Sequence, residues 1–175
     1  MKQRLARLQL LVLDVDGVLS DGGLHYTASG EVLRRFDVRD GLGLKLLQQA
    51  GVQLAFLSGA RGGAIEARAN DLGIAHCFTG VGDKQAVLGT LQGQLAIAPN
   101  ATAFVGDDLN DLVVRPLVGL LICPSDACKP LRLQADLVLR RGGGRGAVRE
   151  LAERILRARG LWAPLAAAGW RQRND

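Results

Sequence analysis

Two carboxylates at the end of an apolar run constrain this chain more than any other feature. Residues 10–13 are all apolar, and Asp14, Val15, Asp16 and Gly17 follow directly. An apolar run without helical spacing predicts a strand buried on both faces. Like charges this close need a counter-charge, which Mg²⁺, a cation that prefers oxygen ligands, can supply. We interpret Asp14 as a nucleophile and Asp16 as a general acid/base at the carboxyl end of a central strand.

Strand and helix patterns alternate along the rest of the chain. Strands are predicted at 52–57, 74–78, 102–105, 119–122 and 136–139. Between them lie predicted helices, one of which is capped by Asp40 and another of which opens at Asp83 or Lys84. This alternation implies right-handed crossovers, and therefore a doubly wound parallel α/β sheet.

The chain is predicted to hold one domain, residues 1–160. A β-hairpin at 19–36 leaves it directly after the Asp16 loop, because two short strand-like runs flank a turn there. The connections between the predicted strands leave no room for a second domain. The tail, residues 161–175, has no clear period, and we expect it to be disordered or ordered by a partner surface.

Composition narrows the class of partner and the compartment. The net charge is +5, but the basic excess sits mainly near the chain ends and no basic stripe alternates with aromatic residues, so nucleic acid is not the expected partner. The three cysteines form no Cys-x-x-Cys pair, which favours free thiols in a reducing compartment. No apolar run is long enough to span a bilayer. We expect a cytoplasmic protein that binds an anionic small molecule and no membrane.

Polar groups end three of the predicted strands: the Asp14 pair, then Ser58, then Asp107 with Asp108. In open parallel sheets, ligands bind outside the carboxyl ends of the strands. We expect these groups to meet there, with Lys84 as a further candidate at the start of a helix. Their convergence is more informative than any one of them. Taken alone, Ser58 is more often a turn residue, Lys84 is more often a solvated helix residue, and Asp107 with Asp108 could simply cap the following helix.

Two other patterns weigh less. Counted as a calcium loop from Asp14, the chain has Val18 and Leu19 where a ligand and a glycine belong, which argues against an EF-hand. Residues 142–147 fit a dinucleotide-binding glycine pattern, but no second strand-helix repeat follows them.

Four pieces in this order resemble the haloacid dehalogenase superfamily of phosphatases. They are residues 14–18, Ser58, Lys84 and the stretch 106–111, and the resemblance covers nearly the whole chain. The resemblance implies that the substrate phosphoryl group passes through an aspartyl-phosphate on the nucleophile, with Ser58 and Lys84 contacting phosphoryl oxygens.

The same resemblance implies a magnesium site. Asp14, the backbone carbonyl of Asp16 and Asp107 would hold Mg²⁺, and Asp108 and Asp111 would support the metal shell directly or through water.

The resemblance narrows over residues 24–26, 35–43 and 142–150, which look like the 3-deoxy-D-manno-octulosonate 8-phosphate phosphatase family. That family implies a homotetramer of capless subunits whose neighbours help to complete each site. It also implies a sugar-acid phosphate substrate from lipopolysaccharide precursor synthesis. The residues carried over as substrate contacts are Asp37, Val38, Arg39, Asp40, Gly41, Lys45, Arg68 and Lys84, with Arg39 as the expected partner of the sugar-acid carboxylate.

Two departures from the family keep alternatives open. Ser58 is followed by Gly59, Ala60 and Arg61 where the family commonly has Thr-Gly-Arg, and Lys45 stands where arginine is usual. Lysine does not replace a bidentate arginine. The alternatives are a phosphatase of a 9-phosphorylated nonulosonate, of the sialic-acid or KDN type, and a catalytically silent tetrameric assembly domain.

Overall fold

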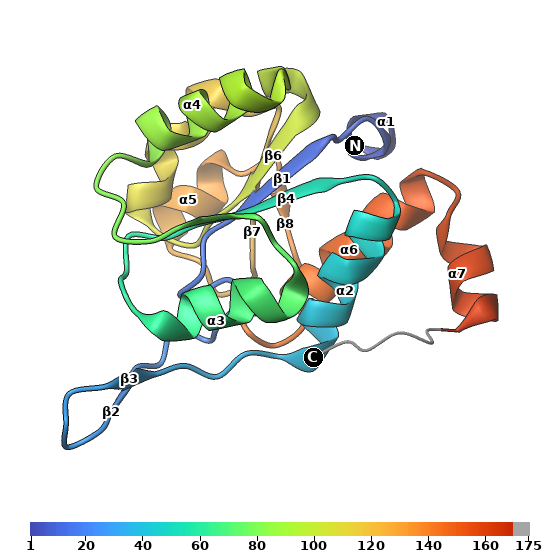
Figure 1. Cartoon of the computed structure of the whole chain (residues 1–175). Coiled ribbons are helices and arrows are strands. Elements are labelled where there is room, and N and C mark those ends of the chain that lie inside the picture. The colour runs from blue at the N-terminus through green and yellow to red at the C-terminus, as the bar shows by residue number, and fades with distance from the viewer. Residues whose placement is uncertain (170–175) are drawn as a thin grey trace.

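A parallel six-stranded sheet forms the centre of the computed structural model, which describes residues 1–169 (Figure 1). Its strand order is β5-β4-β1-β6-β7-β8, so β1 and β6 are the two central strands. The strands are β1 (Leu10–Leu13), β4 (Gln53–Leu57), β5 (His76–Phe78), β6 (Thr102–Val105), β7 (Leu120–Cys123) and β8 (Leu137–Val138). The fold is therefore the predicted doubly wound α/β sheet.

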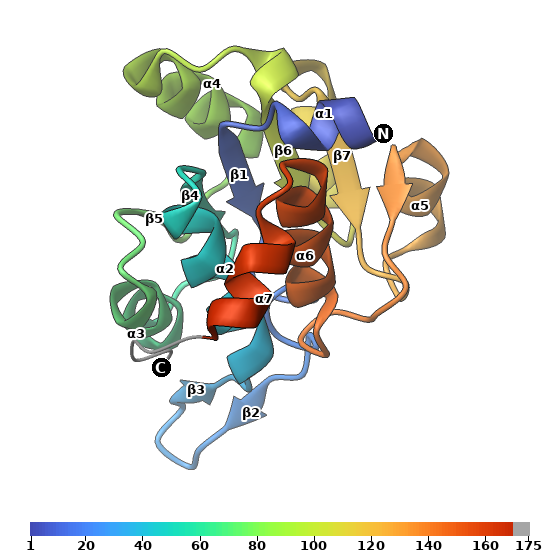
Figure 2. The same ribbon diagram turned by 90° about the vertical axis from the view of Figure 1, so that its right-hand side faces the viewer.

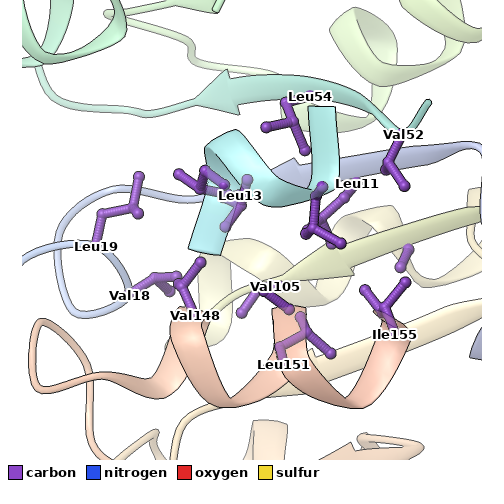
Figure 3. Packing of buried hydrophobic residues seen from close by; sticks show 14 of the residues in the cluster. Leu11, Leu13, Val18, Leu19, Val52, Leu54, Val105, Val148, Leu151 and Ile155 are labelled. Carbon is purple, nitrogen blue, oxygen red and sulfur yellow. The ribbon is translucent and has the colours of Figure 1, made fainter. Parts of the chain in front are cut away.

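Strand β1 is buried on both faces, as its apolar run predicts. Leu11 and Leu13 face one core cluster, while Leu10 and Val12 face the other. Successive side chains of a strand point to opposite faces, so four consecutive apolar residues fill both cores. Figure 3 shows Leu11 and Leu13 in the first core, near the side chains of α6.

Helices cover both faces of the sheet. Helices α2 (Val38–Gln49), α3 (Gly63–Leu72) and α6 (Ala147–Ala158) contribute to the core that holds Leu11. Helix α4 (Lys84–Leu95) and the 3₁₀ helix η2 (Leu109–Leu117) contribute to the core on the opposite face. The remaining helices are α1 (Lys2–Ala6), η1 (Pro99–Ala101), α5 (Lys129–Gln134) and α7 (Trp162–Ala168).

A β-hairpin protrudes from the domain at the carboxyl edge of the sheet (Figures 1 and 2). Its strands, β2 (His25–Tyr26) and β3 (Val32–Leu33), pair antiparallel, and a bridge between Ser20 and Phe36 closes its base. The strands are short and mostly exposed, so the packing of the domain itself does not account for the hairpin.

The helix predicted between the strands at 102–105 and 119–122 is present, as a 3₁₀ helix with Pro116 inside. Two local expectations need correction. Helix α2 is capped by Asp37 and not by Asp40, which instead binds the start of α6. Part of the tail is ordered by its own chain: Trp162 of α7 contacts the guanidinium groups of Arg149 and Arg157, which lie 5.4 and 4.9 Å from the centre of its ring. Residues 170–175 of that tail lie outside the described part.

Within residues 1–169, no helix combines the length and the apolar character that crossing a bilayer requires.

Candidate active site

The carboxyl ends of β1, β4 and β6 meet around one small cavity, as the ends of parallel strands predict. Its volume is about 330 Å³. The residues that line it are Asp14, Asp16, Gly17, Gly22, Ser58, Gly59, Ala60, Asp107, Asp108 and Asn110. The sequence predictions for Asp14, Asp16, Ser58, Asp107 and Asp108 thus come together in space, while Asn110 was not singled out beyond its place in the motif.

Asp14 is fixed at the end of β1 and is only 5% exposed. Its Oδ1 accepts a hydrogen bond from the backbone N–H of Val15 at 2.7 Å. Gly17 lies in the left-handed region, with φ +79°, and a Cβ there would overlap the carboxylate of Asp107. Only glycine allows this close approach, which lets the carboxylate of Asp107, after β6, lie beside that of Asp14, after β1.

Lys84 supplies the positive charge that these carboxylates need. Its Nζ lies 3.0 Å from Oδ2 of Asp14 and 2.6 Å from Oδ1 of Asp111, and the side chain is 3% exposed. Burial alone would lower the pKa of Lys84, but the two facing carboxylates outweigh it and raise that pKa. The lysine therefore stays protonated at neutral pH.

The carboxylates carry more negative charge than Lys84 balances. Burial, followed by the repulsion of Asp111, raises the pKa of Asp14 to about 6 even with Lys84 beside it. Burial and the charges of Asp14 and Asp111 raise the pKa of Asp107 to about 7. Carboxyl groups whose pKa values are raised by their mutual repulsion are stabilised in the ionised form when a cation binds between them.

The donor set fits a hard divalent cation. Carboxylate oxygens of Asp14, Asp107 and Asp111 lie within 4.8 Å of one another. Asp111 is already engaged, because its Oδ1 binds Lys84 and its Oδ2 accepts the N–H of Asp107 at 2.9 Å. Asp14 is engaged less, by Lys84 and the N–H of Val15, whereas Asp111 accepts from Lys84 and from two backbone N–H groups. We therefore expect Asp14 and Asp107 to offer oxygens to Mg²⁺, with Asp111 orienting them.

Two further side chains that line the cavity, those of Asp108 and Ser58, also make hydrogen bonds to the nearby backbone. Asp108 is exposed and caps η2, accepting the N–H of Leu109 at 2.7 Å. Ser58 is buried, and its Oγ accepts the N–H of Ala60 at 3.2 Å, which leaves its hydroxyl hydrogen to donate into the cavity. Arg61, displaced by one position from the family pattern, lies against Gly80 and does not line the cavity.

Asp16 also lines the cavity, but its carboxylate pairs with an arginine of the hairpin and not with Lys84. Both of its carboxylate oxygens accept from the guanidinium of Arg34, at 2.8 and 3.2 Å. Arg34 was not predicted as a site residue, since nothing in its local sequence says that a hairpin arginine reaches Asp16.

Apart from Lys84, the predicted substrate contacts lie along α2 or at its N-cap and, for Arg68, on α3, and none of them lines this cavity. Arg39 is exposed and pairs with Asp37, with Nη2 and Oδ2 2.7 Å apart, and this pairing, led by the hydrogen bond from Arg39, lowers the pKa of Asp37. Gly41 lies under Arg68, whose guanidinium is 5.9 Å from the centre of the Phe36 ring. Val38 is exposed, and Lys45 is half-buried on the same helix. Their contact with substrate stays a prediction.

Asp40 joins this region to the glycine loop. It is 1% exposed, and its carboxylate accepts the N–H groups of Gly146 at 3.2 Å and Arg149 at 2.7 Å, at the start of α6. The glycine loop before α6 packs on the Asp16 loop: Gly144 donates to the carbonyl of Val18 at 2.9 Å. The glycines that resemble a dinucleotide motif are thus part of the wall behind the active-site loop.

Comparison with known proteins identifies the family. No protein-family model matches the chain. It is 43% identical to the 3-deoxy-D-manno-octulosonate 8-phosphate phosphatase KdsC of Escherichia coli over 153 residues, which cover 87% of this chain and 81% of that protein. The corresponding protein of Haemophilus influenzae is 41% identical, over 91% of this chain and 89% of its own length. The chain belongs to the 3-deoxy-D-manno-octulosonate 8-phosphate phosphatase family.

Solved structures agree with this family. The Yersinia pestis 3-deoxy-D-manno-octulosonate 8-phosphate phosphatase superposes with a TM-score of 0.90 at 42% identity, covering 92% of this chain and 87% of that one. The Moraxella catarrhalis phosphatase, solved with magnesium, phosphate and KDO, gives 0.92 at 37% identity, covering 95% and 96%. A haloacid dehalogenase superfamily hydrolase from Legionella pneumophila gives 0.89 at 40% identity, covering 92% and 88%. The fold of the octulosonate phosphatase family is thus that of the haloacid dehalogenase superfamily.

Proposed function

We propose that this protein hydrolyses 3-deoxy-D-manno-octulosonate 8-phosphate, a lipopolysaccharide precursor, through an aspartyl-phosphate on Asp14. The observation that carries this is the contact of Lys84 with both Asp14 and Asp111 beside Asp107, in a chain of this family. A lone carboxylate would repel a phosphate monoester. Here a buried lysine is already aligned with the nucleophile.

In the first step, an Asp14 oxygen attacks phosphorus, the bond from phosphorus to the ester oxygen breaks, and Asp16 gives its proton to that oxygen. In the second, Asp16 takes a proton from water, which attacks the same phosphorus and releases Asp14. The hydroxyl of Ser58 and the ammonium of Lys84 bind phosphoryl oxygens throughout. When bound to Asp14, Asp107 and the carbonyl of Asp16, Mg²⁺ offsets the negative charge of the phosphoryl group.

A phosphatase of a 9-phosphorylated nonulosonate is the second candidate. Arg61 lies against Gly80 outside the cavity, and Lys45 replaces the usual arginine, so the part of the site that would bind the sugar differs from the family pattern. These changes do not involve the residues that transfer the phosphoryl group, and they concern only which sugar acid the site accepts.

Phosphate release from the two sugar-acid phosphates, with and without Mg²⁺, tests the proposal. We expect Mg²⁺-dependent turnover with a higher kcat/KM for the eight-carbon substrate, and loss of it in Asp14→Asn. A higher kcat/KM for the nine-carbon substrate would favour the second candidate. Full activity of Asp14→Asn would refute the nucleophile, and no turnover of any phosphate ester would indicate a silent assembly domain.

A further inference from the structure

A buried arginine from the hairpin needs an explanation. Arg34 follows β3 directly, and its side chain is 2% exposed, whereas that of Arg35 is 55% exposed. Removing a guanidinium from water is costly unless a carboxylate pairs with it in good geometry. The burial of Arg34 therefore calls for a specific partner, which is Asp16.

The contact fixes the orientation of the Asp16 carboxylate as well as its place. Nε of Arg34 donates to Oδ1 at 2.8 Å and Nη2 donates to Oδ2 at 3.2 Å. The hydroxyl of Ser20 donates to Oδ1 at 3.1 Å. Two parallel N–H bonds hold the plane of a carboxylate, which a single lysine contact does not. The Asp16 carboxyl is thus held in one orientation at the wall of the cavity.

Attachment of the hairpin does not explain this pair. The base of the hairpin is already closed by the bridge between Ser20 and Phe36, and Arg35 donates to the carbonyl of Gly144 at 2.8 Å. The third nitrogen of Arg34, Nη1, is buried and has no hydrogen-bond partner among the described residues. Among the described residues, the Arg34 side chain donates hydrogen bonds to Asp16 alone, so it serves that carboxylate and no other part of the hairpin.

We propose that Arg34 is a positioning residue that holds the Asp16 carboxyl where it can reach the ester oxygen of the leaving group. This inference rests on the proposed function, because the orientation of Asp16 matters to turnover only if Asp16 transfers protons. Proton transfer requires hydrogen-bond distance in the reacting complex. A rotated Asp16 would leave phosphoryl binding intact and slow the departure of a poor leaving group.

The test compares kcat/KM for two leaving groups. An alkoxide, as in the octulosonate 8-phosphate, needs a proton to leave, whereas nitrophenolate does not. We expect Arg34→Ala to lower kcat/KM about 10²-fold on the sugar phosphate and less than about 5-fold on nitrophenyl phosphate. Arg34→Lys should recover part of the sugar-phosphate activity. Equal losses on the two substrates, or no loss on either, would overturn the proposal.

Arg35→Ala is the matched control, because it removes the same charge one residue away. It should change kcat/KM by the same factor on both substrates. Circular dichroism and thermal unfolding establish that each variant is folded. If Arg34→Ala is not folded, Arg34→Met and Arg34→Lys carry the same comparison. Wild-type protein that turns over no phosphate ester would refute the proposed function itself, while wild type active only on another primary alkyl phosphate moves the comparison to that substrate.

Discussion

At the scale of single residues, the site is a cluster of carboxylates around one lysine. Asp14, Asp107 and Asp111 share a space in which their oxygens lie within 4.8 Å, and Lys84 neutralises only part of that charge. The strain of this arrangement shows in the raised pKa values of Asp14, to about 6, and Asp107, to about 7. These two pKa values make the stability of the metal-free protein depend on pH.

We predict that metal-free protein loses stability as the pH rises from about 5 to about 8. Both folded pKa values exceed the usual carboxyl value, so the folded state binds more protons than the unfolded state in this window, and the free energy of unfolding must fall with rising pH. Thermal unfolding in a chelator should show a lower Tm at pH 8 than at pH 5. Added Mg²⁺ should reverse most of the fall, and Asp107→Asn should flatten the slope. A Tm that rises across this window would contradict the assignment.

A second residue-scale prediction concerns Lys84. Lys84→Met keeps much of the side-chain volume but leaves Asp14 and Asp111 facing each other without a cation. We expect kcat to fall about 10²-fold or more, because a preorganised charge at the phosphoryl group is lost. Lys129→Met, on α5 outside the cavity, is the control and should leave kcat unchanged. Unchanged turnover in Lys84→Met would remove the lysine from the mechanism.

Sequence reasoning located Asp14, Asp16, Ser58, Lys84 and Asp107 because each follows a strand or opens a helix, and the topology of a parallel sheet brings such positions to one edge. It could not locate Arg34. Its contact with Asp16 depends on how the hairpin leaves the domain, which no periodicity in the sequence specifies. Side-chain reach across a loop is a property of the folded chain.

At the scale of elements, a buried carboxylate of α2, that of Asp40, joins this helix to the start of α6. The sequence predicts Asp40 as the cap of its own helix, because it precedes a run of leucines. In the structure Asp37 takes that role, and Asp40 is buried against the N–H groups of Gly146 and Arg149. Both acids fit the cap rule, and only the packing of α2 against α6 decides between them.

We expect Asp40→Ala to destabilise the fold by about 1–3 kcal/mol, because two backbone donors at the start of α6 lose their acceptor. Asp40→Asn keeps an acceptor oxygen and should cost less. Urea unfolding of the two variants measures the difference. If Asp40 serves only the substrate, both variants will unfold at the wild-type urea concentration.

The glycine loop gives a sharper test at this scale. A Cβ at Gly143 would overlap the backbone carbonyl of Gly17, which is backbone and cannot rotate away. Gly143→Ala should therefore displace the Asp16 loop and reduce both Tm and kcat/KM. Gly93→Ala, inside α4 where a Cβ meets nothing within 4 Å, is the control and should stabilise the protein by about 0.5–1 kcal/mol. Full activity of Gly143→Ala would show that this contact does not shape the site.

At the scale of the whole molecule, the hairpin is the part that the domain does not explain. Leu24, Tyr26 and Leu33 are 43%, 69% and 48% exposed on it. Within residues 1–169 no separate domain covers the cavity, so closure of the site by a neighbouring subunit fits the tetramer that the family resemblance implies. The turn residues in the sequence predict the hairpin. The order of α7 depends on contacts of Trp162 with two arginines of α6, and no periodicity of apolar residues in the sequence predicts such contacts.

We predict that the protein is a tetramer held by its hairpins. Tyr26→Asp places a charge on the most exposed apolar side chain of the hairpin and should give a smaller species by light scattering. Activity on the sugar phosphate should fall with it, because the neighbour's contribution to the site is lost. Leu133→Asp, at an apolar side chain 76% exposed on α5, is the control and should leave the mass unchanged. A monomeric wild type with full activity would rule out closure by subunits.

In the proposed mechanism, the phosphoryl group is transferred to Asp14 before water receives it. Acid quenching during turnover of a sugar-acid phosphate, followed by peptide mapping by mass spectrometry, tests this most directly. We expect a phosphoryl group on the peptide that carries Asp14, absent in Asp14→Asn and reduced without Mg²⁺. A phosphoryl group found on another residue, or turnover by the Asp14→Asn variant at the wild-type rate, would contradict it.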